Sequence, residues 1–236
     1  MNRKAILLAA SPEDDPIPGV YQDLKAFYAY LRSNPGGAWD DGEIFVEENT
    51  TRNQVIAAIN AAQNADYSLV YFAGHGESVR LGLPWLETRM LLRSGETITE
   101  RELNSRSPRC TLIMDCCRRT PEQNIEASLI NFSMLLEHGR GSIDFRKFYQ
   151  KGLEVAESGL VKIYSTAAGS AAADIHSFTQ YLLNETNKWV VGNKGILSLE
   201  DAVNLAKIAM KLENPQQQPE YQGGRRLRHF PFAVQI

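Results

Sequence analysis

Two short and almost continuously apolar runs constrain the fold of this chain most strongly. They are SLVYFA, within a predicted strand at Tyr67–Ala73, and TLIMD, at Thr111–Asp115. A strand that is apolar on both of its faces is typical of the centre of a parallel sheet that helices cover on both sides. The two runs therefore predict central strands of an open α/β sheet.

The remaining strand and helix candidates alternate along the chain. We predict further strands at Ala5–Ala10, Glu43–Glu47, Val161–Thr166 and His229–Val234. Helical spacing of apolar residues predicts helices at Val20–Leu31, Asn53–Ala65, Thr99–Leu103, Pro121–Glu137, Phe145–Glu157, Ser177–Trp189 and Ser198–Leu212. Such alternation indicates right-handed crossovers between parallel strands, with ligands bound beyond the carboxyl ends of the strands.

Composition and charge argue against several classes of protein. The net charge is −3, from 25 Lys and Arg against 28 Asp and Glu, whereas nucleic-acid binding usually needs a strongly basic domain. No apolar stretch approaches bilayer length, and the run Ala5–Ala10 is too short for a signal peptide. Cys110, Cys116 and Cys117 have neither disulfide nor zinc-site spacing. We therefore expect a single cytoplasmic domain over residues 1–236, with no metal site and no membrane or nucleic-acid partner.

Two reactive side chains follow the two central strands. His75 follows the strand Tyr67–Ala73 and lies between two glycines, and Cys117 follows the strand Thr111–Asp115. Because successive strand residues alternate between faces, Asp115 and Cys117 should project together while Cys116 points away. Strands linked by one crossover are often neighbours, so we expect His75 and Cys117 at the same edge of the sheet.

A thiol and an imidazole at one edge have a chemical use. The imidazole takes the thiol proton, and the resulting thiolate is a strong nucleophile. The backbone N–H groups of Gly76 and Cys117, both at turns that leave strands, are candidates for an oxyanion hole. A lone histidine is more often structural and a lone buried cysteine inert, but their joint placement favours a catalytic dyad.

At these residues the chain resembles the caspase–metacaspase superfamily. YFAGHGE is similar to its histidine motif and LIMDCCR to its cysteine motif. The resemblance extends over nearly the whole chain, from AILLAA and the helix VYQDLKAFYAYL to VKIYSTAAGSAAAD, HSFTQYLL and a closing strand HFPFAV. It implies an α/β, caspase-like three-layer sandwich with a six-stranded, mainly parallel sheet flanked by helices. It also implies a cysteine endopeptidase that acts on protein substrates, most similar to prokaryotic metacaspase-like members.

The cysteine motif departs from the family patterns in an informative way. Metacaspases commonly carry Asp-Ser-Cys-His-Ser-Gly, and this chain has DCCRRT from Asp115 to Thr120. The resemblance aligns Cys117 with the family nucleophile and Cys116 with its non-catalytic neighbour. Animal caspases carry Gln-Ala-Cys, so Asp115 stands where their glutamine would be.

An acid two positions before the nucleophile predicts the substrate class. A carboxylate there favours Arg or Lys at the substrate's P1 position and repels acids. Metacaspases pair this acid with a second one, four residues after a glycine, and here Asp23 follows Gly19 at that spacing. We therefore predict Asp23 and Asp115 as the floor of the S1 pocket. The alternative for Asp23 is a first-turn acid that the helix dipole stabilises.

The resemblance also implies how substrate is held and how the enzyme matures. Ser165, Thr166 and Ala167 occupy the position where the family pairs its main chain with an extended substrate. The segment Arg118–Gly159 corresponds to the loop that family members cut, and HGRGS predicts self-cleavage after Arg140, unless this segment is helical.

A peptidase that cuts after residues as common as arginine and lysine would harm its own cell unless its activity were controlled. We expect a small-molecule activator, a metal ion such as calcium, or a partner protein to order its loops, although the chemistry itself requires no cofactor. By analogy with compact prokaryotic relatives, the context is a stress or antiviral response.

Two other readings remain open. The first is a catalytically inactive caspase-fold scaffold or ligand-sensing module, although such proteins usually lose the histidine or the cysteine. The second is a flavodoxin-like regulatory or nucleotide-binding domain. It is weaker, because the acidic ASPEDDPIPG after the first strand lacks a glycine-rich phosphate loop.

Overall fold

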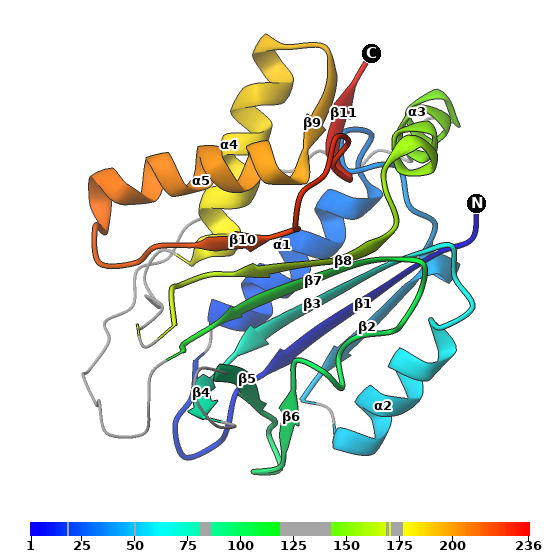
Figure 1. The fold of residues 1–236 in the computed structure, drawn as a ribbon. Coiled ribbons are helices and arrows are strands. Elements are labelled where there is room, and N and C mark those ends of the chain that lie inside the picture. Colours follow the sequence, from blue (N-terminus) through cyan, green and yellow to red (C-terminus); the bar gives the residue numbers. More distant parts are fainter. Residues whose placement is uncertain (18, 50, 81–85, 119–142, 169, 171–176) are drawn as a thin grey trace.

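The computed structural model describes the whole chain except residues 18, 50, 81–85, 119–142, 169 and 171–176. A six-stranded sheet forms its centre, in the order β10-β8-β7-β3-β1-β2 (Figure 1). These strands are β1 Arg3–Ala10, β2 Ile44–Glu48, β3 Tyr67–Gly74, β7 Arg109–Cys116, β8 Gly159–Tyr164 and β10 Glu220–Gln222. All neighbours pair in parallel except β10, which runs antiparallel to β8. The predicted six-stranded, mainly parallel sheet is confirmed.

Helices cover both faces of this sheet, which gives three layers (Figure 1). One face carries α1 Gly19–Arg32, α3 Ile143–Val155, α4 Phe178–Gly192 and α5 Leu199–Glu213, and the other carries α2 Arg52–Ala61. Thr51 and Ser198 cap α2 and α5, each accepting a backbone N–H of the first turn. Ser177 caps α4 in the same way. The helix predicted at Pro121–Glu137 lies outside the described residues.

The strand period explains why the central runs are apolar throughout. In β3, Leu69 and Tyr71 pack on the side of α1 and α4, while Val70 and Phe72 pack on the side of α2. Both faces of the strand are therefore buried, so apolar side chains occupy both sets of alternating positions. In β7 the same alternation puts Asp115 on the α1–α4 side.

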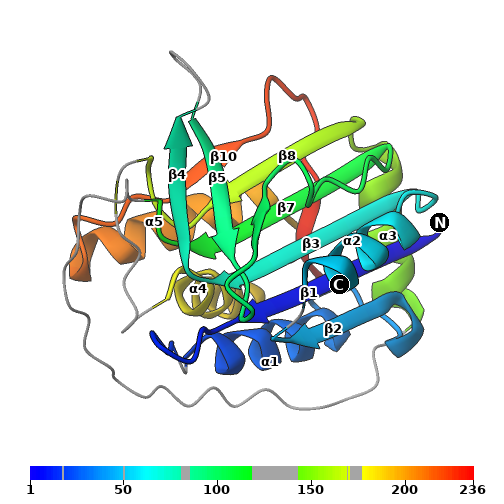
Figure 2. The same cartoon turned by 90° about the horizontal axis from the view of Figure 1, so that it is seen from below.

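A second sheet begins at the carboxyl end of β3 and was not predicted. The strands β4 Gly76–Arg80, β5 Leu86–Leu91 and β6 Thr97–Thr99 form it, with antiparallel pairing (Figure 2). The predicted helix at Thr99–Leu103 is wrong, because Thr97–Thr99 is a strand and turns follow it. Five residues are too few for a stable helix, and β-branched residues favour a strand. The chain thus turns into a new sheet directly after His75.

The closing strand of the central sheet was also misassigned. The predicted strand His229–Val234 forms as β11 Pro231–Gln235, but it pairs with β9 Gly195–Ser198 in a separate two-stranded sheet. The sixth strand of the central sheet is β10, which pairs with β8. Its sequence EYQ is short and polar, so it gives no apolar signal. β8 itself ends at Tyr164, two residues before the predicted end.

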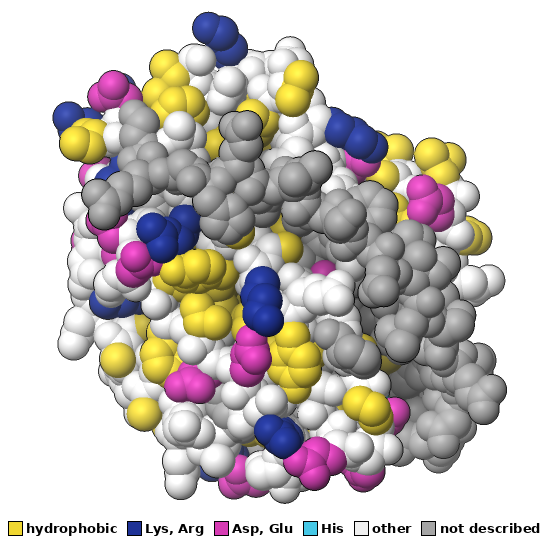
Figure 3. Space-filling view, turned by 180° about the vertical axis from the view of Figure 1, so that it is seen from behind, with side chains coloured by type: hydrophobic (Ala, Val, Ile, Leu, Met, Phe, Trp, Pro, Cys, Tyr) yellow, Lys and Arg dark blue, Asp and Glu magenta, His cyan; other side chains and the backbone are white. Residues whose placement is uncertain are grey.

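Among the described ranges, no helix combines the length and the apolar character that crossing a bilayer requires. On the face that Figure 3 presents, basic and acidic side chains are interspersed.

Candidate active site

The two motif segments leave neighbouring strands in matched register. β3 and β7 pair in parallel with Ala73 opposite Asp115 and Gly74 opposite Cys116. The next residue after this pair is His75 in the segment that follows β3 and Cys117 in the segment that follows β7. Neighbouring strands lie about 4.8 Å apart. The strand adjacency expected from the crossover rule is thus confirmed, and the two reactive residues leave the sheet at the same edge.

The two segments stay in contact beyond the ends of their strands. A Cβ atom built on Gly76 would lie 2.6 Å from Cys116 Sγ and 2.7 Å from the carbonyl oxygen of Cys117. Real Cβ atoms do not approach so closely, so only glycine fits at this position.

The pairing of β4 with β5 sets the direction of the Gly76 backbone. The Leu91 N–H donates to the carbonyl oxygen of His75 at 3.0 Å, and Gly76 lies opposite Met90. In an antiparallel ladder, hydrogen-bonded and non-hydrogen-bonded pairs alternate, so the N–H of Gly76 points away from β5. The Gly76 N–H therefore does not donate to β5, which is consistent with its predicted place in an oxyanion hole.

Replacing Gly76 with alanine is expected to lower kcat/KM by about a hundredfold, since misplacement of a site by about 1 Å can cost that much. The added methyl group must displace the Cys116–Cys117 backbone. Steady-state kinetics on a cleavable substrate measure the effect. Gly42→Ala is the matched control, because nothing lies within 4 Å of a Cβ there. Activity of Gly76→Ala within threefold of wild type would contradict this packing.

The His75 ring contacts the loop that follows β1. Its Nε2 atom lies 2.8 Å from the backbone oxygen of Asp15 and 3.3 Å from Asp15 Oδ2. A carbonyl oxygen only accepts, so Nε2 carries the hydrogen in this contact. In a neutral imidazole the basic nitrogen is then Nδ1. Sequence reasoning missed Asp15, although its loop leaves β1 at the same edge of the sheet as His75.

The two adjacent cysteines have opposite environments. Cys116 is buried among apolar residues on the α2 side of the sheet, and burial, then the charges of Cys117 and Asp115, raise the pKa of its thiol. Cys117 is only partly buried, and both cysteine residues contribute to the lining of a cavity on the side of α1. The alternation predicted for this motif therefore places one thiol in the apolar core and leaves the other partly exposed.

The cavity beside Cys117 has two acidic side chains in its wall. Asp23 from α1 and Asp115 from β7 line it together with Ser177 and small or apolar residues. Its volume is about 30 Å³, which is room for roughly two water molecules. The structure thus brings both predicted S1 acids together, in a cavity much smaller than an arginine side chain requires.

The two acids differ in how the protein holds them. Asp23 is 5% exposed, and burial, followed by the charge of Asp115, raises its pKa to about 7, against weaker hydrogen bonds from Ser177 and Gln180. Asp115 is 8% exposed, and its Oδ2 accepts the N–H of Thr179 at 2.9 Å and the Thr179 hydroxyl at 2.7 Å. Asp23 is the fifth residue of α1 and is buried, so it is not a solvated first-turn acid.

The three residues predicted to pair with substrate differ in accessibility. Ser165 and Thr166 are fully buried, and their carbonyl oxygens accept from Gln217 Nε2 at 2.9 Å and Arg118 Nη1 at 3.3 Å. Ala167 is partly exposed. This segment lies beside the end of β7, where the Ser165 N–H donates to the Met114 carbonyl oxygen, and its first two carbonyl groups are engaged within the protein.

Arg118, the residue after Cys117, is held on several sides. Its guanidinium lies 3.8 Å from the ring centre of Tyr164 and donates to Thr88 Oγ1 at 3.1 Å and Glu220 Oε2 at 2.8 Å. Sequence reasoning treated Arg118 only as the first residue of the cleavable segment, but its side chain is buried. Arg140, the predicted self-cleavage site, lies outside the described residues.

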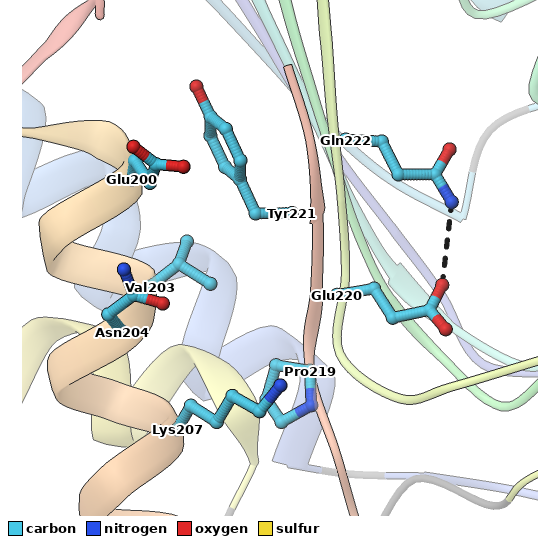
Figure 4. Close-up of a pocket in the computed structure, with 8 residues that line it drawn as sticks. All are labelled: Glu200, Val203, Asn204, Lys207, Pro219, Glu220, Tyr221 and Gln222. Carbon is cyan, nitrogen blue, oxygen red and sulfur yellow. Dashed lines mark hydrogen bonds between the residues drawn. The ribbon is translucent and has the colours of Figure 1, made fainter. Parts of the chain in front are cut away.

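A larger groove lies between β10 and α5, on the side of β10 opposite to the Arg118 contacts. It measures about 320 Å³ and separates β10 from α5. In Figure 4, Tyr221 points across the groove toward α5, while Glu220 points away from it. Glu220 therefore belongs to the Arg118 contacts, and the groove is a separate feature.

The acidic residues just before β2 have basic partners. Asp40 and Glu43 form ion pairs with Arg146, and Asp41 pairs with Arg32. In the part of the chain that the structure describes, no group of three or more His, Cys, Asp or Glu side chains is arranged to bind a metal ion.

Comparison with known proteins identifies the family. A family model described as the caspase domain matches residues 3–230. Caspase-1 from Spodoptera frugiperda superposes with a TM-score of 0.62 at 14% identity, over 99% of this chain and 90% of that chain. A protein from Geobacter sulfurreducens superposes with a TM-score of 0.58 at 17% identity, over the full length of both chains. At these identities the two structures establish the fold alone. No curated protein sequence matches the chain significantly. The match to the family model extends from β1 to the start of β11, and the chain belongs to the caspase-domain family of cysteine peptidases.

Proposed function

We propose that this protein is a cysteine endopeptidase that cleaves protein substrates after arginine or lysine. One observation carries the proposal. The register of β3 and β7 brings His75 and Cys117 to one edge of the sheet, beside a cavity walled by two buried carboxyl groups.

The proposed reaction begins with proton transfer from Cys117 to Nδ1 of His75. The thiolate then attacks the carbonyl carbon of the scissile bond, and the N–H groups of Gly76 and Cys117 stabilise the oxyanion that forms. His75 returns the proton to the leaving amine, and water hydrolyses the acyl-enzyme. The contact between Nε2 and the Asp15 carbonyl supports this role, because it leaves Nδ1 as the base.

The proposed specificity follows from the charge in the pocket. Burying a carboxylate is costly unless an opposite charge compensates it, and a guanidinium or ammonium group at P1 supplies that charge. An acidic P1 side chain would add a third negative group beside Asp23 and Asp115 and would be rejected.

The proposed gate follows from the small volume of the pocket. A cavity of about 30 Å³ must enlarge before a basic side chain enters. We infer that a ligand, a metal ion such as calcium, a partner protein or self-processing near Arg140 drives this opening. The small volume of the pocket is also the observation that favours the alternative function, an inactive caspase-fold scaffold or ligand-sensing module.

A panel of fluorogenic peptides with Arg, Lys, Asp or Leu at P1, each with and without calcium, tests the proposed function. We expect cleavage after Arg and Lys, with a kcat/KM at least a hundredfold above that for Asp, since a like-charge contact costs several kcal/mol. Equal rates for Asp and Arg would refute the basic specificity. If no peptide is cleaved and Cys117 does not react with an electrophilic arginyl ketone, either with or without calcium, the result favours the scaffold alternative.

A further inference from the structure

The first turn of α4 contacts both acids of the cavity. The Thr179 N–H and hydroxyl both donate to Asp115 Oδ2, and Gln180 Nε2 donates to Asp23 Oδ1 at 3.3 Å. Ser177, the cap of this helix, also bonds to Asp23. The amino-terminal end of a helix carries partial positive charge, so this arrangement stabilises negative charge in the pocket wall.

The Thr179 hydroxyl is part of a hydrogen-bond chain with a fixed direction. It has one proton, and it donates that proton to Asp115. The Tyr71 hydroxyl, 2.9 Å from Thr179 Oγ1, must therefore donate to it. Burial, then the charges of Asp23 and Asp115, raise the pKa of Tyr71, so its phenol keeps the proton it donates. The ring itself is fixed by stacking on Phe27, with centroids 4.5 Å apart.

All three side chains of this series of hydrogen bonds, Tyr71, Thr179 and Asp115, are buried. Thr179 is 1% exposed and Tyr71 is fully buried, so water does not substitute for either hydroxyl. Hydrogen bonds to charged groups in such surroundings are stronger than neutral ones and restrict the geometry of the acceptor. These hydrogen bonds, from residues of β3 and α4, thus fix one oxygen of Asp115. They do not depend on the segment with Cys117 that follows Asp115.

We propose that Thr179, supported by Tyr71, is a positioning residue for P1 specificity, which holds the Asp115 carboxylate in place to receive a basic side chain. The inference rests on the proposed function and deepens it. Thr179 acts through Asp115 and touches none of the reacting atoms, so its loss should affect substrate binding rather than the chemical step.

Thr179→Val tests this, because valine keeps the shape and the backbone N–H while removing the hydroxyl. We expect KM for an Arg-P1 peptide to rise about tenfold, the lower range for losing a hydrogen bond to a charged group, with kcat within about threefold. Thr179→Ser should restore the wild-type KM. Thr186→Val is the matched control, since Thr186 is a buried threonine of the same helix whose hydroxyl donates to the backbone oxygen of Leu182.

The outcomes separate this inference from the proposed function. A wild-type enzyme that does not cleave after Arg or Lys refutes both. Wild-type cleavage with an unchanged KM in Thr179→Val, a loss confined to kcat, or failure of Thr179→Ser to rescue overturns the inference alone. If Thr179→Val does not fold, Tyr71→Phe is read by the same criteria, because it removes the donor behind Thr179 and leaves α4 intact.

Discussion

Cys117→Ala is expected to lower kcat/KM by at least a thousandfold, since removing a nucleophile leaves only the catalysis that binding and the oxyanion hole supply. His75→Ala should cause a loss of similar size, because the two residues act as one unit and their effects do not add. Cys116→Ala should stay within about fivefold of wild type, since its buried thiol packs on the opposite face of the sheet. Steady-state kinetics on an Arg-P1 peptide measure all three variants.

The comparison between the two adjacent cysteines is the informative part. A general disturbance of the DCCR segment would affect Cys116→Ala and Cys117→Ala alike. Wild-type activity in Cys117→Ala, or a larger loss in Cys116→Ala, would reverse the assignment of the nucleophile.

Asp23→Asn is expected to stabilise the protein at alkaline pH while it weakens recognition of arginine. Burial, with the charge of Asp115, raises the pKa of Asp23 from 3.8 to about 7. Between these values the folded protein holds a proton that the unfolded chain has released, so the free energy of unfolding falls as pH rises from about 4 to 7. Asparagine does not ionise, so the variant should be roughly 2–4 kcal/mol more stable than wild type at pH 8. Near pH 4 the difference should disappear.

Denaturant unfolding at pH 4 and pH 8 measures this difference. Glu48→Gln is a suitable control, because Glu48 is an exposed acid of β2 with only a 3.9 Å ion pair to Lys25. An Asp23→Asn variant that is less stable than wild type at pH 8 would contradict a strained, buried acid at this position.

The same ionisation should appear in substrate preference. As Asp23 loses its proton, the pocket gains negative charge, so the preference for arginine should increase as pH rises through about 7. The ratio of kcat/KM for Arg-P1 to that for Leu-P1 isolates this effect, because any change in the catalytic groups affects both substrates alike. The groups that face Asp23 are Asp115 from β7, Tyr71 from β3, and Ser177 and Gln180 from α4. A flat ratio in the wild type, or a rising ratio in Asp23→Asn, would exclude this role.

The parts of the fold that repeat a strong local signal could be predicted from the sequence. β3 and β7 are apolar on both faces, and their adjacency follows from one right-handed crossover, so the edge that carries His75 and Cys117 was predictable. Asp23 was singled out by the resemblance to metacaspases, and the structure places it, buried, beside Asp115 in the wall of one cavity.

The rest depends on contacts that leave no periodic pattern. β10 consists of three polar residues and is a strand because β8 offers an open edge, so HFPFAV was taken for the sixth strand instead. The contact of Asp15 with His75 joins residues 60 positions apart, and the bonds of Thr179 to Asp115 join residues 64 positions apart. Such pairs follow from tertiary packing, which no local propensity encodes.

Labelling with an electrophilic arginyl ketone, followed by intact-mass measurement and peptide mapping, tests the central claim most directly. One probe should attach to wild-type protein at Cys117, with no labelling of His75→Ala or Cys117→Ala and little reaction with the equivalent aspartyl probe. Labelling at Cys110 or Cys116, or equal reaction with the aspartyl probe, would contradict the account.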